Sequence, residues 1–219
     1  MSRPTAVVLE VGAKKVFAVA VDWPGWCRAG RTEELALEAL EEYARRYLEV
    51  AERAGVRFPA SATAAFEVVE RVTGDATTDF GAPGKVADSD AERLTAARAR
   101  RQAALVGAAW DVFDRIAAVT PPALRKGPRG GGRDRDKMID HVLSTEAAYA
   151  RKIGVKHPPP ARSDTIAIKV LRDDILAVLS RAGEGTPPVP RGWPPRYAAR
   201  RIAWHALDHA WEMQDRTES

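Results

Sequence analysis

The chain has 219 residues, of which 45% are hydrophobic and 29% are charged. This length accommodates one large domain or two small ones, and the composition is typical of globular proteins. The single cysteine, Cys27, excludes an internal disulfide and a cysteine-rich zinc site. The sequence contains no run of about 18 apolar residues, so we expect no transmembrane helix. Because Met1-Ser-Arg-Pro4 also lacks the apolar stretch of a signal peptide, we expect a cytoplasmic protein without a membrane partner.

The net charge of +4 comes mainly from one segment, residues 124–137, which is rich in arginine and glycine. A basic segment can bind nucleic acid, but this one contains no aromatic residue on which bases would stack. We therefore interpret it as a solvated loop and do not expect a nucleic-acid partner. Binding of nucleic acid or of an acidic small molecule remains the alternative.

The first third of the sequence predicts a small β-β-α-β domain over residues 1–80. β-branched residues indicate strands at 5–11 and 15–21, and a third strand is predicted at 64–72. Between them, apolar residues at helical spacing predict one helix up to Gly55, with Thr32 as its N-cap. We read Asp22-Trp-Pro-Gly-Trp26 as a break after the second strand.

The remainder of the sequence is predicted to be helical after a linker at 73–87, which is rich in Gly, Thr, Asp and Pro. Prolines and glycines bound four long helices. We expect these helices at about 89–119, 134–154, 164–182 and 194–216. Four long helices with three connections indicate an antiparallel four-helix bundle over residues 89–219, and hence an α+β protein.

Three of the four histidines occupy inward positions of two predicted helices. His205 and His209 lie four residues apart, so both side chains point to one side of the last helix, together with apolar residues. His141 lies on the corresponding stripe of the second predicted helix. Three unpaired imidazoles are costly to bury, and a shared cation would remove that cost. The pattern predicts a site for zinc, nickel, iron or copper with open coordination positions. A chance spacing of packed histidines is the alternative.

Two acidic residues accompany the histidine pair. Glu212 follows His209 by three residues and is our candidate acid/base group or additional ligand, although it could equally pair with an arginine. Asp208 is interpreted as a surface charge rather than a group that orients an imidazole. His157, within a proline-rich segment, is expected in a solvent-exposed loop and not as a ligand.

Residues 101–216 resemble the DinB/YfiT-like four-helix bundles. Asp140-His-Val-Leu-Ser-Thr-Glu-Ala-Ala-Tyr149 looks like the second-helix segment of that family, and Trp204-His-Ala-Leu-Asp-His-Ala-Trp-Glu212 looks like its fourth-helix segment. The resemblance implies that His141, His205 and His209 bind a divalent metal. The tryptophan that often precedes the second-helix histidine in the family is absent here, where the sequence is Gly132-Arg-Asp-Arg-Asp136.

Relatives of the DinB/YfiT type include transferases and isomerases that use a low-molecular-weight thiol such as bacillithiol or mycothiol. The resemblance therefore implies a metal-dependent thiol transferase, or a related enzyme, with a small-molecule substrate. The alternative is a non-catalytic stress-response or interaction module in which the metal is structural or vestigial.

The N-terminal third resembles the HicB antitoxin-like fold. The likeness consists of Pro24-Gly25 after a strand, and then of the step Gly30-Arg-Thr32 into a helix that contains Glu38-Ala-Leu40. Such a small sheet would be only marginally stable alone. It would gain stability by packing on the helices or by dimerising, and we expect a homodimer. Trp23, Trp26 and Cys27 are interpreted as packing residues rather than as a cap over the metal site.

Overall fold

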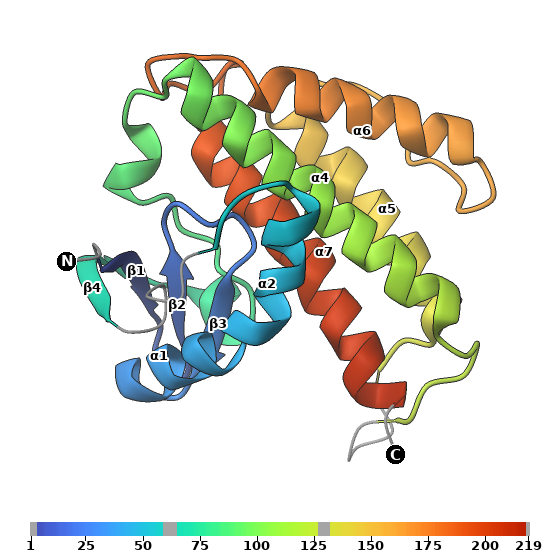
Figure 1. The fold of residues 1–219 in the computed structure, drawn as a ribbon, viewed down its shortest axis with the longest axis horizontal. Coiled ribbons are helices and arrows are strands. Elements are labelled where there is room, and N and C mark those ends of the chain that lie inside the picture. Colours follow the sequence, from blue (N-terminus) through green and yellow to red (C-terminus); the bar gives the residue numbers. More distant parts are fainter. Residues whose placement is uncertain (1–3, 59–64, 127–131, 218–219) are drawn as a thin grey trace.

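A computed structural model describes residues 4–58, 65–126 and 132–217 (Figure 1). These residues form a mixed α/β structure with a four-stranded sheet, seven α-helices and one short 3₁₀ helix. The sheet and the first two helices lie on one side of the last helix, α7 (Pro195–Thr217), which runs through the middle of the molecule (Figure 1). Within the described residues, no helix is both long enough and apolar enough to cross a bilayer.

The sheet has the strand order β3-β2-β1-β4. Its strands are β1 (Thr5–Val11), β2 (Val16–Ala20), β3 (Cys27–Gly30) and β4 (Phe66–Thr73). The first three strands are antiparallel neighbours, whereas β4 pairs with β1 in parallel. A parallel pair needs a crossover connection, and α1 (Glu33–Glu42) and α2 (Ala44–Arg53) lie in that connection.

Both faces of the sheet are covered, which explains why β2 is buried along its whole length. On one face Leu9 and Ala18 belong to the core that also contains Leu40 of α1 and Tyr47 of α2. On the other face Phe17, Val19 and Cys27 pack with Trp204 of α7. The sheet is thus attached directly to the helix that carries two of the candidate ligands.

Two details of the predicted N-terminal part are wrong. The helix predicted from Thr32 to Gly55 is two helices that meet at Tyr43, although Thr32 is the N-cap as predicted. The chain changes direction there because α1 packs on β2 and β3 whereas α2 packs on α4 (Ala96–Val119). The strand β3, which was not predicted, follows the turn at Pro24-Gly25. Gly25 has φ +92° and lies so close to α7 that an added Cβ would be 2.6 Å from Leu207 Cδ1.

The predicted linker also contains regular structure. It includes α3 (Ala76–Phe80), which Asp75 caps by accepting a hydrogen bond from the backbone N–H of Thr77 at 2.8 Å. A 3₁₀ helix, η2 (Asp88–Ala91), follows. The first long helix therefore begins at Ala96, not near Ser89, with Thr95 as its N-cap. These elements were missed because four or five residues are too few to show a helical period.

The other long helices occur close to their predicted positions. They are α5 (Arg135–Arg151), α6 (Thr165–Leu179) and α7. The first two end about three residues earlier than predicted, before Gly154 and Gly183. Helix α7 contacts α4, α5 and α6.

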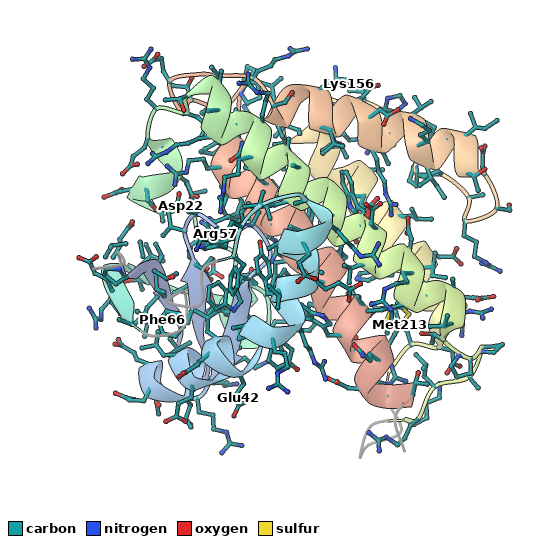
Figure 2. The ribbon with its side chains drawn as sticks, viewed as in Figure 1. Asp22, Glu42, Arg57, Phe66, Lys156 and Met213 are labelled. Carbon is teal, nitrogen blue, oxygen red and sulfur yellow. The ribbon has the colours of Figure 1, made fainter. Side chains whose placement is uncertain are left out.

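Buried apolar side chains from the sheet, α1, α2 and the long helices form one continuous core. Figure 2 shows side chains filling the space between the sheet and the helices. Across the α2–α4 contact, Arg115 pairs with Glu49 at 2.7 Å. The residues expected to form two units, 1–80 and 89–219, therefore share their buried surface. Ala64, the predicted start of the last strand, lies outside the described residues.

Candidate metal centre

Helices α5 and α7 bring the three predicted histidines together. One nitrogen from each of His141, His205 and His209 lies within 4.8 Å of the others. His205 is buried, with 7% of its surface exposed, and the other two are partly buried. The four-residue spacing on α7 places two imidazoles on one side of that helix, and α5 packs against this side.

The contact between two of the imidazoles has about the length expected for two ligands of a single ion. The Nε2 atoms of His141 and His205 are 3.2 Å apart. Metal–nitrogen bonds of about 2.0–2.1 Å at a tetrahedral angle separate two nitrogens by about 3.3–3.4 Å. The ring centroid of His209 lies 5.0 Å from that of His141 and 4.7 Å from that of His205. The donor set therefore fits a divalent metal such as zinc.

Glu212 sets the tautomer of one candidate ligand. His209 Nδ1 lies 3.0 Å from Glu212 Oε2, and Arg216 Nη1 donates to Glu212 Oε1 at 3.0 Å. These two contacts lower the pKa of Glu212, so its carboxylate is ionised and can only accept hydrogen bonds. Nδ1 of His209 must then carry the proton, which leaves Nε2 bare for a metal. This imidazole–carboxylate contact is the arrangement that commonly orients metal-bound histidines.

The surroundings of the group keep two of the imidazoles neutral. Desolvation, with the charges of Arg133 and His209, lowers the pKa of His141 to about 4. Desolvation also lowers the pKa of His205 well below its ordinary value, and Nδ1 of His205 is buried without a partner among the described residues. Neutral imidazole is the form that binds metal, so at neutral pH no proton competes strongly for these ligand positions.

The other residues singled out in the sequence have different surroundings. Asp208 is neither an isolated surface charge nor a partner of an imidazole, because Arg28 of β3 donates to it at 3.1 Å. His157 lies outside the histidine group and contacts Asp174 at 2.7 Å. Trp110, Trp204 and Trp211 are buried and pack in the interior.

Tyr149 lies beside the group, with its ring centroid 5.7 Å from that of His205. Trp23, Trp26 and Cys27 do not cap the metal site and have packing roles. Trp23 and Trp26 pack around Tyr47 in the core, and the thiol of Cys27 is buried against the sheet and Trp204. Burial raises the pKa of Cys27, so this thiol is not activated as a nucleophile.

The arginines near the group were not predicted from the sequence. Arg216 donates to the carbonyl oxygens of Arg125 and Arg133, at 2.7 and 2.8 Å, and so joins α7 to the basic segment. Its spacing of four from Glu212 was a signal that could have revealed it. Nothing in the sequence indicates that Arg28, 180 residues from Asp208, belongs here. Residues 127–131 of the basic segment lie outside the described residues.

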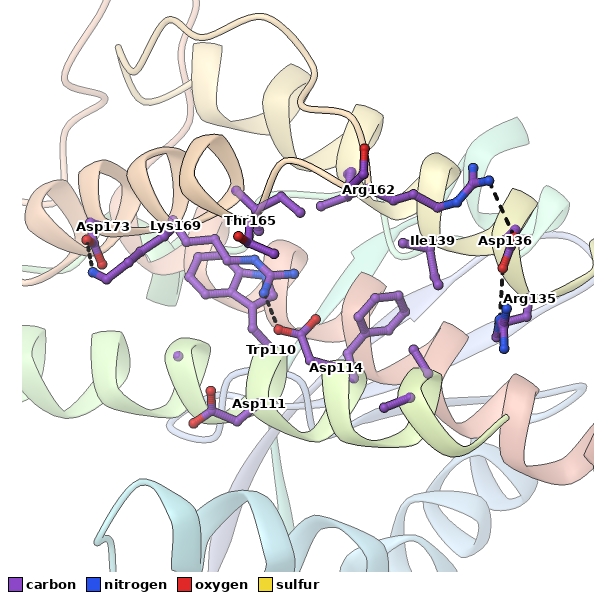
Figure 3. A pocket seen from close by; sticks show the side chains of 18 of the residues that line it. Trp110, Asp111, Asp114, Arg135, Asp136, Ile139, Arg162, Thr165, Lys169 and Asp173 are labelled. Carbon is purple, nitrogen blue, oxygen red and sulfur yellow. Dashed lines mark hydrogen bonds and ion pairs between the residues drawn. The ribbon is translucent and has the colours of Figure 1, made fainter. Parts of the chain in front are cut away.

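A large groove of about 1000 Å³ lies elsewhere, between α4, α5 and α6 (Figure 3). No histidine lines it. Several charged residues of its rim pair with one another, as in the contacts of Arg172 with Asp114 at 2.6 Å and of Arg162 with Asp136 at 3.4 Å. A smaller cavity of about 290 Å³ borders the metal centre, because Glu212 is one of its lining residues.

Comparisons of this chain with protein-family models, with curated proteins and with solved structures found no match.

Proposed function

We propose that the protein binds one divalent metal ion through His141, His205 and His209, and that this centre acts on a low-molecular-weight thiol. The observation that carries the proposal is the convergence of three imidazole nitrogens within 4.8 Å, although His141 and His205 are 64 residues apart in sequence. Three imidazole ligands leave at least one coordination position open on zinc, as in catalytic zinc sites.

The proposal includes a DinB/YfiT-like four-helix bundle formed by α4, α5, α6 and α7. Its support is that α5 and α7, the second and fourth of these helices, carry the histidines at the positions that the resemblance implies. The N-terminal part is proposed to be HicB-like, supported by the step Gly30-Arg-Thr32 that leads from β3 into α1. A cytoplasmic location and a homodimer are further parts of the proposal.

A divalent metal in this position would lower the pKa of a coordinated thiol and so supply a thiolate at neutral pH. The protein groups have complementary roles. Glu212 orients His209 through Nδ1 and is itself held by Arg216, so we assign it to positioning rather than to proton transfer. Arg133 and Arg201, whose charges act on His205, favour an anionic thiolate beside the imidazoles.

Metal analysis of the purified protein tests the proposal. We expect about one equivalent of metal per chain in the wild type, and loss of metal in His141→Ala and in His205→Ala. His157→Ala is the matched control, because it removes an imidazole that contacts Asp174 outside the group. Metal contents that are the same in all four proteins would contradict the proposed site.

A cobalt-substituted sample then separates an enzyme from a non-catalytic module. A change in the visible spectrum on adding a small thiol would show that the open position accepts a thiolate. Bound cobalt without any response to thiols would favour the interaction module. The engagement of Glu212 with both His209 and Arg216 favours this second candidate, since it leaves no unengaged carboxylate oxygen for acid/base catalysis.

A further inference from the structure

The groove of about 1000 Å³ between α4, α5 and α6 contains none of the proposed metal ligands. Helices α4 and α6 are close together at one end, where a Cβ added to Gly107 would be 3.7 Å from Leu176 Cδ1. Figure 1 shows the two helices diverging toward the other end, with α5 visible between them. Ala117 and Ala118 of α4 line the groove and are too small to fill the space between the helices. A volume of this size lies in the range of small-molecule sites.

Apolar side chains form most of the inner wall of the groove. They come from all three helices and include Trp110 and Phe113 of α4, Ile139 and Leu143 of α5, and Ile168 of α6. Figure 3 shows Trp110 and Ile139 on the wall of the groove. Removing apolar surface from water is favourable in proportion to its area. The wall therefore favours a ligand with an apolar body.

The charged side chains of the rim are largely engaged with one another. Each of the four cations that line the groove has a carboxylate partner, and these cations are Arg135, Arg162, Lys169 and Arg172. Of the four lining carboxylates, Asp111 alone has no cationic partner within the described part of the chain, and it is exposed to water. An anionic ligand would find no free cation, and a cationic one would gain only the weak attraction of an exposed ion pair. The rim therefore favours a ligand without a charge.

An ion pair crosses the groove and limits what it can accommodate. Arg172 of α6 donates to Asp114 of α4 at 2.6 Å, a contact drawn in Figure 3. Arg172 is 8% exposed and also contacts the buried Glu146 at 3.2 Å, so moving it aside would leave a buried carboxylate unpaired. A helix of another protein, about 10–12 Å wide, could not reach the wall on both sides of this pair. A small molecule can lie beside it.

We propose that this groove binds an uncharged small molecule with an aliphatic or aromatic body. The body packs on the apolar wall beside the Arg172–Asp114 pair, and any polar group of the ligand remains at the rim, in contact with water. This site goes beyond the proposed function, since no histidine lines it.

Competition with an uncharged fluorescent probe, N-phenylnaphthylamine, tests the inference on the full-length protein. Hexanol, heptanol and octanol should displace the probe with affinities that rise about fourfold for each added methylene, the gain from burying one CH₂ group. Octanoate should bind about tenfold more weakly than octanol, because its charge loses water and finds no free cation. Octylamine should bind within about fivefold of octanol, since Asp111 offers only an exposed ion pair.

Gly107→Leu should fill one end of the groove. Only Leu176 lies within 4 Å of a Cβ added at Gly107, and leucine favours a helix more than glycine does, so we expect this variant to fold. It should bind octanol at least about fourfold more weakly than the wild type. Ala104→Leu is the matched control, because Ala104 is exposed on α4 outside the groove, and it should keep the wild-type affinity. Ala118→Leu fills the groove at another position and serves if Gly107→Leu fails to fold.

Several results would overturn the inference. They are affinities that do not rise with chain length, octanoate that binds as tightly as octanol, a preference for octylamine of more than about fivefold, and filling variants that bind like Ala104→Leu. A chelator should leave the affinities unchanged, because the three histidines lie outside the groove. Binding that is lost with the chelator would place the alcohol at the metal centre instead. If no alcohol binds and sedimentation shows a dimer that dissociates in Gly107→Leu, the groove belongs to a contact with a second copy, and the inference is wrong.

Discussion

Removing the carboxylate of Asp90 should destabilise the protein strongly, because it would leave a buried arginine without its counter-ion. Asp90 in η2 is 0% exposed and Arg200 in α7 is 7% exposed. Arg200 donates to both oxygens of Asp90, with Nε at 2.9 Å from Oδ1, and the backbone N–H of Ala87 donates to Oδ2 at 2.9 Å. The pair attaches η2 to α7 five residues before His205.

The size of the effect follows from this burial. Removing one partner of a buried ion pair costs about 3–5 kcal/mol, since the remaining charge stays desolvated. In Arg200→Met/Asp90→Ala both charges are gone, so we expect the double variant to be more stable than Asp90→Ala alone. An exposed pair contributes little, and Arg93 and Glu184 are 77% and 73% exposed. Glu184→Ala should therefore change stability by less than about 1 kcal/mol.

Urea unfolding followed by circular dichroism measures these differences, provided that the slope with denaturant is the same in all variants. The metal-free protein should be used throughout, so that changes in metal affinity do not contribute to stability. A cost below about 1 kcal/mol for Asp90→Ala, or equal costs for Asp90→Ala and Glu184→Ala, would refute the argument from burial.

Three further predictions concern the candidate site and its neighbourhood. In the metal-free protein, the folded pKa of His141 is about 4 and the unfolded value is about 6.5, so the unfolded state binds more protons between these values. The free energy of unfolding should thus fall as the pH drops from about 6.5 to 4, by on the order of 1–2 kcal/mol for this partly exposed group, and less steeply in His141→Gln. Glu212→Gln should weaken metal binding by about 10–100-fold in a chelator competition assay, because His209 loses the carboxylate that orients it. Cys27 should react slowly with a thiol reagent in the native protein and rapidly in urea, since burial shields it and raises its pKa.

Each of these three predictions has a clear contrary result. The same pH dependence in the wild type and in His141→Gln would mean that His141 does not titrate as described. An unchanged metal affinity in Glu212→Gln would remove the orienting role. Fast labelling of Cys27 under native conditions would show that β3 is accessible, in conflict with its packing against Trp204.

The long helices and the inward phase of the histidines could be predicted from the sequence, because both are local properties. A helix of 15 or more residues shows its period several times. Prolines mark some helix limits, with Pro121 just after the end of α4 and Pro194 just before the start of α7. The spacing of His205 and His209 on α7 needs only helical geometry. The side on which His141 lies could be read from its own helix in the same way.

Features that arise from contacts between distant segments could not be predicted from the sequence. The break at Tyr43 arises because α1 and α2 pack on different partners, and the local sequence retains a helical pattern across it. Likewise, β3 was missed because its four residues follow a tight turn that is seated on Leu207 of α7.

The sequence by itself determined which residue types line the inward sides of α5 and α7, and so identified the three histidines. Only the tertiary structure decided that their nitrogens meet within 4.8 Å, that Glu212 is held between His209 and Arg216, and that Arg28 reaches Asp208 from the sheet. The physical reason is the range of the interactions involved. Helical phase is set by neighbours three and four residues away, whereas an ion pair between residues 28 and 208 exists only after the sheet and α7 have packed together.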